Sequence, residues 1–138
     1  MIDAAIRAQV IARAGNRCEY CQLPQEYYEA TFHVEHIAAQ QHTTDDRLTN
    51  LAWCCPRCNR KKGPNLAGID PLTQAVTLLF HPRNDQWHEH FRWNGPILIG
   101  STPAARATIA VLDLNNGDRV RLRESLIAEG VFARADVP

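Results

Sequence analysis

The stretch DDRLTNLAWCCPRCNRKKG, residues 45–63, runs from an acidic loop through an apolar segment into a basic segment. It contains one cysteine pair, Cys55 and Cys58, and a second pair of the same spacing, Cys18 and Cys21, precedes it. Thiolates with two residues between them can reach one tetrahedral Zn²⁺ from a tight turn. The two pairs therefore predict a four-cysteine zinc site, closed to water and hence structural, and Cys54 is expected to be a core residue.

Composition and charge limit the classes of protein to which this chain can belong. The 138 residues carry 15 Lys+Arg and 15 Asp+Glu, a formal net charge of zero, so no global basic field indicates nucleic-acid binding. The opening MIDAAIRAQV lacks the pattern of a secretory signal, and no apolar run approaches the ~18 residues of a spanning helix. We therefore expect a soluble, cytoplasmic protein, in which the five cysteines favour metal binding over disulfides.

Periodicity and turn residues predict an α+β fold. Helices are expected from residue 2 to near residues 15–16 and over 56–63, 102–114 and 118–129, and short strands over 31–37, 51–53, 75–80, 91–93 and 97–99. Glycine and proline make residues 64–71 the best candidate for a boundary between an N-terminal functional unit and a C-terminal extension. The expected organisation is a functional core over residues 1–66 and a C-terminal α/β extension over residues 67–138 that packs on it.

The segment HVEH, residues 33–36, has two chemical interpretations. His33 and Glu35 match the H-x-E of zinc-dependent nucleobase deaminases, with Cys55 and Cys58 as the remaining zinc ligands. Two features count against this interpretation. The deaminase signature places proline before the first cysteine, whereas Pro56 lies inside the pair, and the other cysteine pair would have no role.

The other interpretation takes three motifs together: RCEYC at residues 17–21, VEHI at 34–37 and DDRLTNLAWCCPRCNRKKG at 45–63. In this order they resemble the HNH endonuclease family with its zinc-knuckle cysteines, over residues 12–63. Residues 67–93 are also similar to a C-terminal extension found in bacterial HNH proteins. The resemblance implies a ββα-metal core with an N-terminal helix, and hydrolysis of DNA phosphodiesters to 5′-phosphate and 3′-hydroxyl ends.

The resemblance also implies a role for each matching residue. His36 corresponds to the general base, and Asn50 to the asparagine that holds the adjoining loop in place. Glu35 and Asn59 correspond to the ligands of a catalytic divalent ion, and their oxygen donors suit Mg²⁺ or Mn²⁺. The family more usually has aspartate or histidine at the position of Glu35, so the longer side chain is a departure from its pattern.

A local basic cluster predicts contact with phosphates beside this site, and it comprises Arg57, Arg60, Lys61 and Lys62. The expected partner is DNA, bound in a salt-sensitive and largely sequence-nonspecific way, with a protein partner or a homodimer as a source of specificity. A second cluster, at residues 119–123, is equally typical of a solvated helix face. The non-enzymatic alternative is a four-cysteine zinc module that binds nucleic acid or protein without cutting.

Overall fold

The computed structural model describes residues 2–132 of the chain, and within them the predicted α+β class is confirmed. This part of the chain forms five α-helices and three two-stranded antiparallel sheets. It divides into two compact units. Within the described residues, the first comprises residues 2–66 together with His81–Asp85, and the second comprises Ala67–Phe80 together with residues 86–132. Among the described residues, no helix has the length and hydropathy needed to cross a bilayer.

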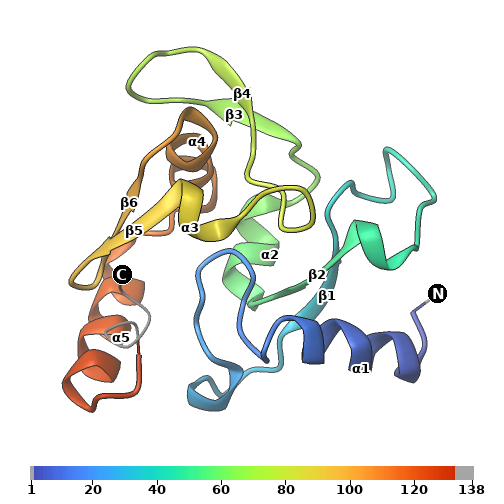
Figure 1. The fold of residues 1–138 in the computed structure, drawn as a ribbon, viewed down its shortest axis with the longest axis horizontal. Helices are drawn as coiled ribbons and strands as arrows, with labels where there is room; N and C mark the ends of the chain where they lie inside the picture. Colours follow the sequence, from blue (N-terminus) through green and yellow to red (C-terminus); the bar gives the residue numbers. More distant parts are fainter. Residues whose placement is uncertain (1, 133–138) are drawn as a thin grey trace. The chain divides into compact units, whose positions relative to one another are not determined.

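The first unit is built on a strand pair followed by a helix (Figure 1). Its elements are α1 (Ala4–Arg13), β1 (His33–His36), β2 (Leu51–Cys54) and α2 (Pro56–Lys62), with single 3₁₀ turns at Gln25–Tyr27 and Leu48–Asn50. The strands pair antiparallel, with His33 opposite Cys54 and His36 opposite Leu51. The ββα order implied by the resemblance is thus present in residues 33–62.

Capping residues set the bounds of both helices. α1 begins after Asp3, whose carboxylate accepts a hydrogen bond from the Ile6 amide at 2.8 Å. α2 begins after Cys55, with Pro56 in the first turn, where its missing N–H is not needed. It ends at Gly63, whose φ of +50° is favourable for glycine.

The core of the first unit lies on β2, which is buried along its whole length. Trp53 is 1% exposed, its ring centroid lies 6.0 Å from that of Phe32, and its indole N–H donates to Asn16 at 3.2 Å. The Arg7 guanidinium of α1 lies 4.9 Å from the Trp53 ring. β2 therefore leads directly from the hydrophobic core into Cys55 and α2.

Residues 81–85 return to the first unit although they follow a segment of the second. Arg83 forms an ion pair with Glu19, and the other carboxylate oxygen of Glu19 accepts the Trp53 amide at 2.7 Å. Glu19 lies between Cys18 and Tyr20, so this bond connects the returning segment to the first cysteine pair. The sequence did not predict this return.

The second unit contains two further hairpins and two longer helices. Its elements are β3 (Ala67–Ile69), β4 (Val76–Leu78), α3 (Trp87–His90), β5 (Phe91–Asn94), β6 (Ile97–Gly100), α4 (Pro103–Leu112) and α5 (Gly117–Ala128). α4 packs against β3, β4 and β6. At Gly68 a Cβ atom would lie 2.6 Å from the Val111 side chain, so this close approach requires glycine. Asp70 and Arg106 form two hydrogen bonds of 2.9 Å between the hairpin and α4.

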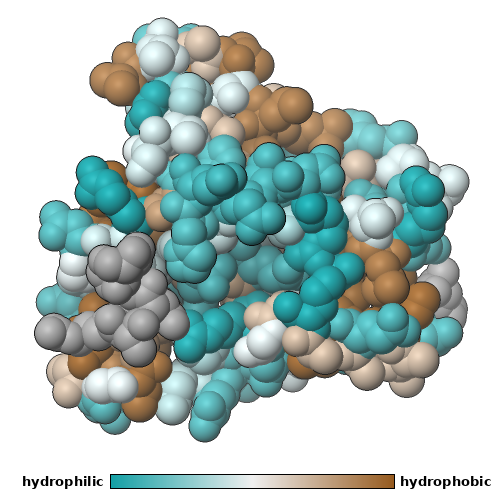
Figure 2. All heavy atoms as spheres, viewed as in Figure 1, coloured by the Kyte–Doolittle hydropathy of each residue, from teal (hydrophilic) through white to brown (hydrophobic). Residues whose placement is uncertain are grey.

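The β3–β4 hairpin exposes several hydrophobic side chains, and Figure 2 shows brown areas among hydrophilic ones at the top of the view. Leu72, Val76 and Leu78 are 72%, 74% and 71% exposed. On α5, Arg121 is exposed, whereas Arg119 and Arg123 are buried, and Arg123 donates to the carbonyl of Leu114 at 2.9 Å. Residues 119–123 therefore do not form a continuous basic surface.

Candidate functional site

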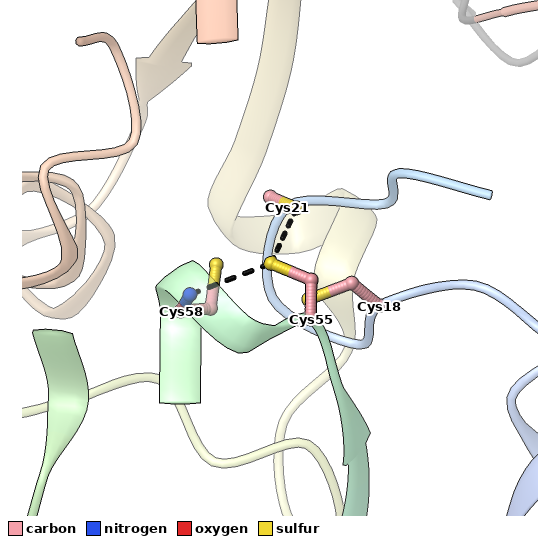
Figure 3. A group of neighbouring side chains, drawn as sticks. All are labelled: Cys18, Cys21, Cys55 and Cys58. Atoms are coloured by element: carbon pink, nitrogen blue, oxygen red, sulfur yellow. Dashed lines mark hydrogen bonds between the residues drawn. The ribbon is translucent and has the colours of Figure 1, made fainter. Parts of the chain in front are cut away.

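The four paired cysteines come together in one cluster. Cys18 and Cys21 lie in the loop after α1, and Cys55 and Cys58 lie at the start of α2 (Figure 3). Their sulfur atoms all lie within 4.8 Å of one another, and all four side chains are buried. The Cys21 and Cys55 sulfurs are 3.8 Å apart, and the Cys58 amide donates to the Cys55 sulfur at 3.4 Å.

This donor set fits Zn²⁺. A tetrahedral ion with Zn–S bonds of about 2.3 Å places its sulfurs about 3.8 Å apart, which is the spacing of Cys21 and Cys55. Burial raises the pKa of Cys18, so a thiolate there requires a compensating cation. The fifth cysteine, Cys54, is a core residue as predicted, and burial raises its pKa to about 11. His33 is exposed and is not one of the four clustered residues, contrary to what a deaminase site would require.

Glu35 lies on the buried face of β1, within a polar network. Its carboxylate accepts a hydrogen bond from the Tyr20 hydroxyl at 2.9 Å, and the Lys62 ammonium lies 3.1 Å from its other oxygen. Lys62 is 1% exposed and also donates to the carbonyl of Ile37 at 2.7 Å. Burial raises the pKa of Glu35, while the charge of Lys62 and the Tyr20 hydrogen bond oppose that rise.

Lys62 therefore differs from its predicted role. It was expected to meet phosphates at the surface, whereas its ammonium is inside the unit and pairs with Glu35. The helical repeat explains this, because Lys62 follows Cys58 by four residues and so shares its buried face. Arg60 and Lys61 are exposed and Arg57 is half-buried, so these three are the residues of the cluster that reach the surface.

His36, the last residue of β1, has a partner that the sequence did not predict. Its Nε2 atom lies 2.7 Å from Oδ1 of Asp46, and the two side chains are 15% and 40% exposed. The hydrogen bond from His36 lowers the pKa of Asp46. Asp46 lies in a polar loop ten residues further along the chain, at the start of the 45–63 motif, and no role was predicted for it. A carboxylate at the end of a loop that returns to the strand is the one signal that sequence reasoning offered.

Asn50 joins that loop to the segment after His36. Its side-chain oxygen accepts the Ala38 amide at 2.8 Å, and its amide group donates to the carbonyls of Ala38 at 3.0 Å and Asp45 at 2.9 Å. Its own carbonyl accepts the Ile37 amide at 2.8 Å. The buried Asn50 thus satisfies the backbone on both sides of the loop.

The residues predicted to bind the catalytic divalent ion, Glu35 and Asn59, suit such an ion in one respect and not in another. The carboxylate of Glu35 and the amide of Asn59, which is half-buried one residue after Cys58, offer the oxygen donors that Mg²⁺ or Mn²⁺ prefers. The Lys62 ammonium beside Glu35 already supplies positive charge, which an added cation would have to share. By donor type the two residues fit a divalent ion, and Lys62 opposes its binding.

The cysteine cluster yields a prediction about metal content. Protein purified without chelator should contain about one zinc per chain, and Cys58→Ser should lose the zinc and unfold the first unit, because a structural zinc contributes folding free energy. Elemental analysis and circular dichroism measure both effects. Cys54→Ala is the matched control, a buried cysteine outside the cluster, and should retain zinc. A zinc-free protein with its fold intact would refute the site.

The buried pair yields a prediction about stability. Lys62→Met should lower the unfolding free energy by about 3–5 kcal/mol, because it leaves the Glu35 carboxylate buried without its cation. The double variant Glu35→Gln with Lys62→Met should lose less than the sum of the single variants. Chemical denaturation of zinc-loaded protein measures these values. Lys61→Met, on the exposed side of the same helix, should stay within about 0.5 kcal/mol of the unmodified protein. Equal effects at residues 61 and 62 would contradict the pairing.

Comparisons with known proteins match part of this chain to one family model. Residues 18–65 match the family model of the HNH endonuclease. The chain is 27% identical over 126 residues to the Septu protein PtuB of Bacillus thuringiensis. That match covers 88% of this chain and 46% of the relative, so the chain spans about half the length of the curated protein it matches. No solved structure matches the chain.

The matched segment contains both cysteine pairs, the β1–β2 pair and α2, so the predicted resemblance is confirmed. HNH domains are generally those of nucleases that use metal ions, which agrees with the donor groups found here. Residues 18–65 of this chain match the HNH endonuclease domain.

Proposed function

We propose that the chain is a metal-dependent endonuclease that hydrolyses DNA phosphodiester bonds. The observation that carries the proposal is the His36 imidazole at the end of β1, bonded to Asp46 within the segment that matches the HNH model. An imidazole can accept a proton near neutral pH, which is what the activation of water requires. A passive zinc module would need no such histidine.

The proposed reaction assigns one task to each residue. His36 takes a proton from the attacking water, whose oxygen bonds to phosphorus while the bond to the 3′ oxygen breaks. Asn50 holds the loop that faces His36. Glu35 and Asn59 are the proposed ligands of Mg²⁺ or Mn²⁺, which would polarise the phosphate and neutralise the leaving oxygen. The products are a 5′-phosphate and a 3′-hydroxyl.

DNA binding is proposed to rest on α2. Arg60 and Lys61 are exposed and Arg57 is half-buried on this helix, which also carries Asn59. These positive side chains can meet phosphates that flank the cut, and such contacts weaken as salt concentration rises. Because the formal net charge is zero, we expect weak and largely sequence-nonspecific binding, with a protein partner or a second copy of the chain supplying specificity.

One observation favours the non-enzymatic alternative, a zinc module that binds nucleic acid or protein without cutting it. Lys62 already neutralises Glu35, so the site is electrically balanced without an added ion. The two proposals differ in one measurable respect, because only the nuclease needs His36.

The predicted test is a pair of histidine variants in a plasmid-nicking assay with Mg²⁺, Mn²⁺ or Ni²⁺. His36→Ala should lower the rate by roughly 100-fold or more, as expected for a lost general base, with DNA affinity and zinc content unchanged. His33→Ala is the control on the same strand, and its exposed side chain should matter little. Loss of zinc and activity in the His33 variant, beside an active His36 variant, would overturn the nuclease assignment.

A further inference from the structure

The pair formed by His36 and Asp46 leaves the two imidazole nitrogens in different environments. Nε2 is engaged by the Asp46 carboxylate at 2.7 Å. A neutral imidazole has one nitrogen that donates and one that accepts, and an ionised carboxylate can only accept. The hydrogen bond therefore requires the proton to be on Nε2, which leaves the lone pair on Nδ1.

The loop around Asp46 is fixed on both sides of that residue. The carbonyl of Asp45 accepts from the Asn50 side chain at 2.9 Å. The Asp45 carboxylate accepts from the backbone amide and the guanidinium of Arg47, each at 2.9 Å, and these bonds lower its pKa to about 2. Asp46 thus lies between two residues with fixed partners, so its carboxylate is held against His36 by the loop.

We propose that Asp46 is the positioning residue for His36: it fixes the tautomer with the proton on Nε2 and turns Nδ1 towards the attacking water. The inference rests on the proposed nuclease function. In the step, one water proton moves to Nδ1 while Nε2 keeps its own, and the resulting imidazolium is stabilised by the Asp46 carboxylate, which stays ionised. Nothing in the sequence motifs assigns this role.

The neighbouring charged groups do not offer His36 an alternative partner of the same kind. Glu35 is on the other face of β1 and is bonded to Tyr20 and Lys62. Asp45 is bonded to Arg47. Among the carboxylates of this loop and strand, Asp46 is the one recorded in contact with the imidazole.

The first measurement is the tautomer itself, which does not depend on activity. Nitrogen-15 NMR of histidine-labelled, zinc-loaded protein at about pH 8, where an ordinary imidazole is neutral, distinguishes a protonated ring nitrogen from an unprotonated one. The His36 signals are assigned by their absence in His36→Ala. The unmodified protein should show the proton on Nε2. In Asp46→Asn, where the amide can donate to Nε2, the proton should shift towards Nδ1.

The second measurement separates positioning from folding. Asp46→Asn should lower kcat by roughly 10-fold or more with KM and zinc content nearly unchanged, because the base loses its correct tautomer. Asp46→Glu, which restores a carboxylate, should recover part of the rate. Asp118→Asn removes an equal charge from an exposed position on α5 and should leave the rate unchanged.

The outcomes distinguish this inference from the nuclease proposal. An Asp46→Asn protein with the tautomer and kcat of the unmodified protein would overturn the role of Asp46. If the unmodified protein nicks no DNA with any of the metals, the nuclease proposal fails. The tautomer measurement alone then tests whether Asp46 positions His36. A His36 proton on Nε2 in both proteins would overturn the inference in that case, and a shift in Asp46→Asn would support it.

Discussion

The four-cysteine cluster is the constraint on which the first unit depends. It joins the loop after α1 to the start of α2, two segments more than thirty residues apart in the chain. β2 ends one residue before Cys55, and β1 pairs with β2 along its length, so this one cluster of cysteines connects the strand pair and the helix. His36 at the end of β1 and Asn59 beside Cys58 take their positions from this arrangement. A structural metal can supply the folding free energy that so small a core lacks.

A second constraint is the buried charge of Glu35. Placing a carboxylate inside the unit is unfavourable unless it is paired and hydrogen-bonded, and Lys62 and Tyr20 supply both. The same pairing opposes a divalent ion at Glu35. The site therefore combines a proposed ion ligand with a resident cation, and the balance between Lys62 and an added ion would determine how tightly the ion binds.

Much of the fold could be predicted from the sequence because local chemistry determines it. Cysteine spacing predicted the cysteine cluster, and Pro56 and Pro103 predicted the starts of α2 and α4. β3 was not predicted, because three residues including Gly68 carry no strand pattern and depend on packing against α4. α3, a single turn between aromatic residues, was also missed. The predicted packing of residues 67–138 on the core remains a prediction.

The site was less predictable because its partners are distant in the sequence. The run of basic residues after Asn59 looks uniform in composition, yet the helical repeat separates buried Lys62 from exposed Lys61. That repeat was a usable signal. For Asp46 the sequence offered only its place near the end of a polar loop, because its bond to His36 spans a loop whose path is set by the three side-chain hydrogen bonds of Asn50. The ligand roles of Glu35 and Asn59 remain proposals.

The central claim is that the proposed nuclease site and the structural zinc site are separate. The most direct test removes and restores the two metals independently in one sample. Brief EDTA treatment should abolish plasmid nicking while zinc content and circular dichroism stay unchanged, and Mg²⁺ or Mn²⁺ should restore the activity, because a thiolate-bound zinc is held more tightly than an ion on two oxygen ligands. Activity that disappears only with the zinc, and that only zinc restores, would contradict this arrangement.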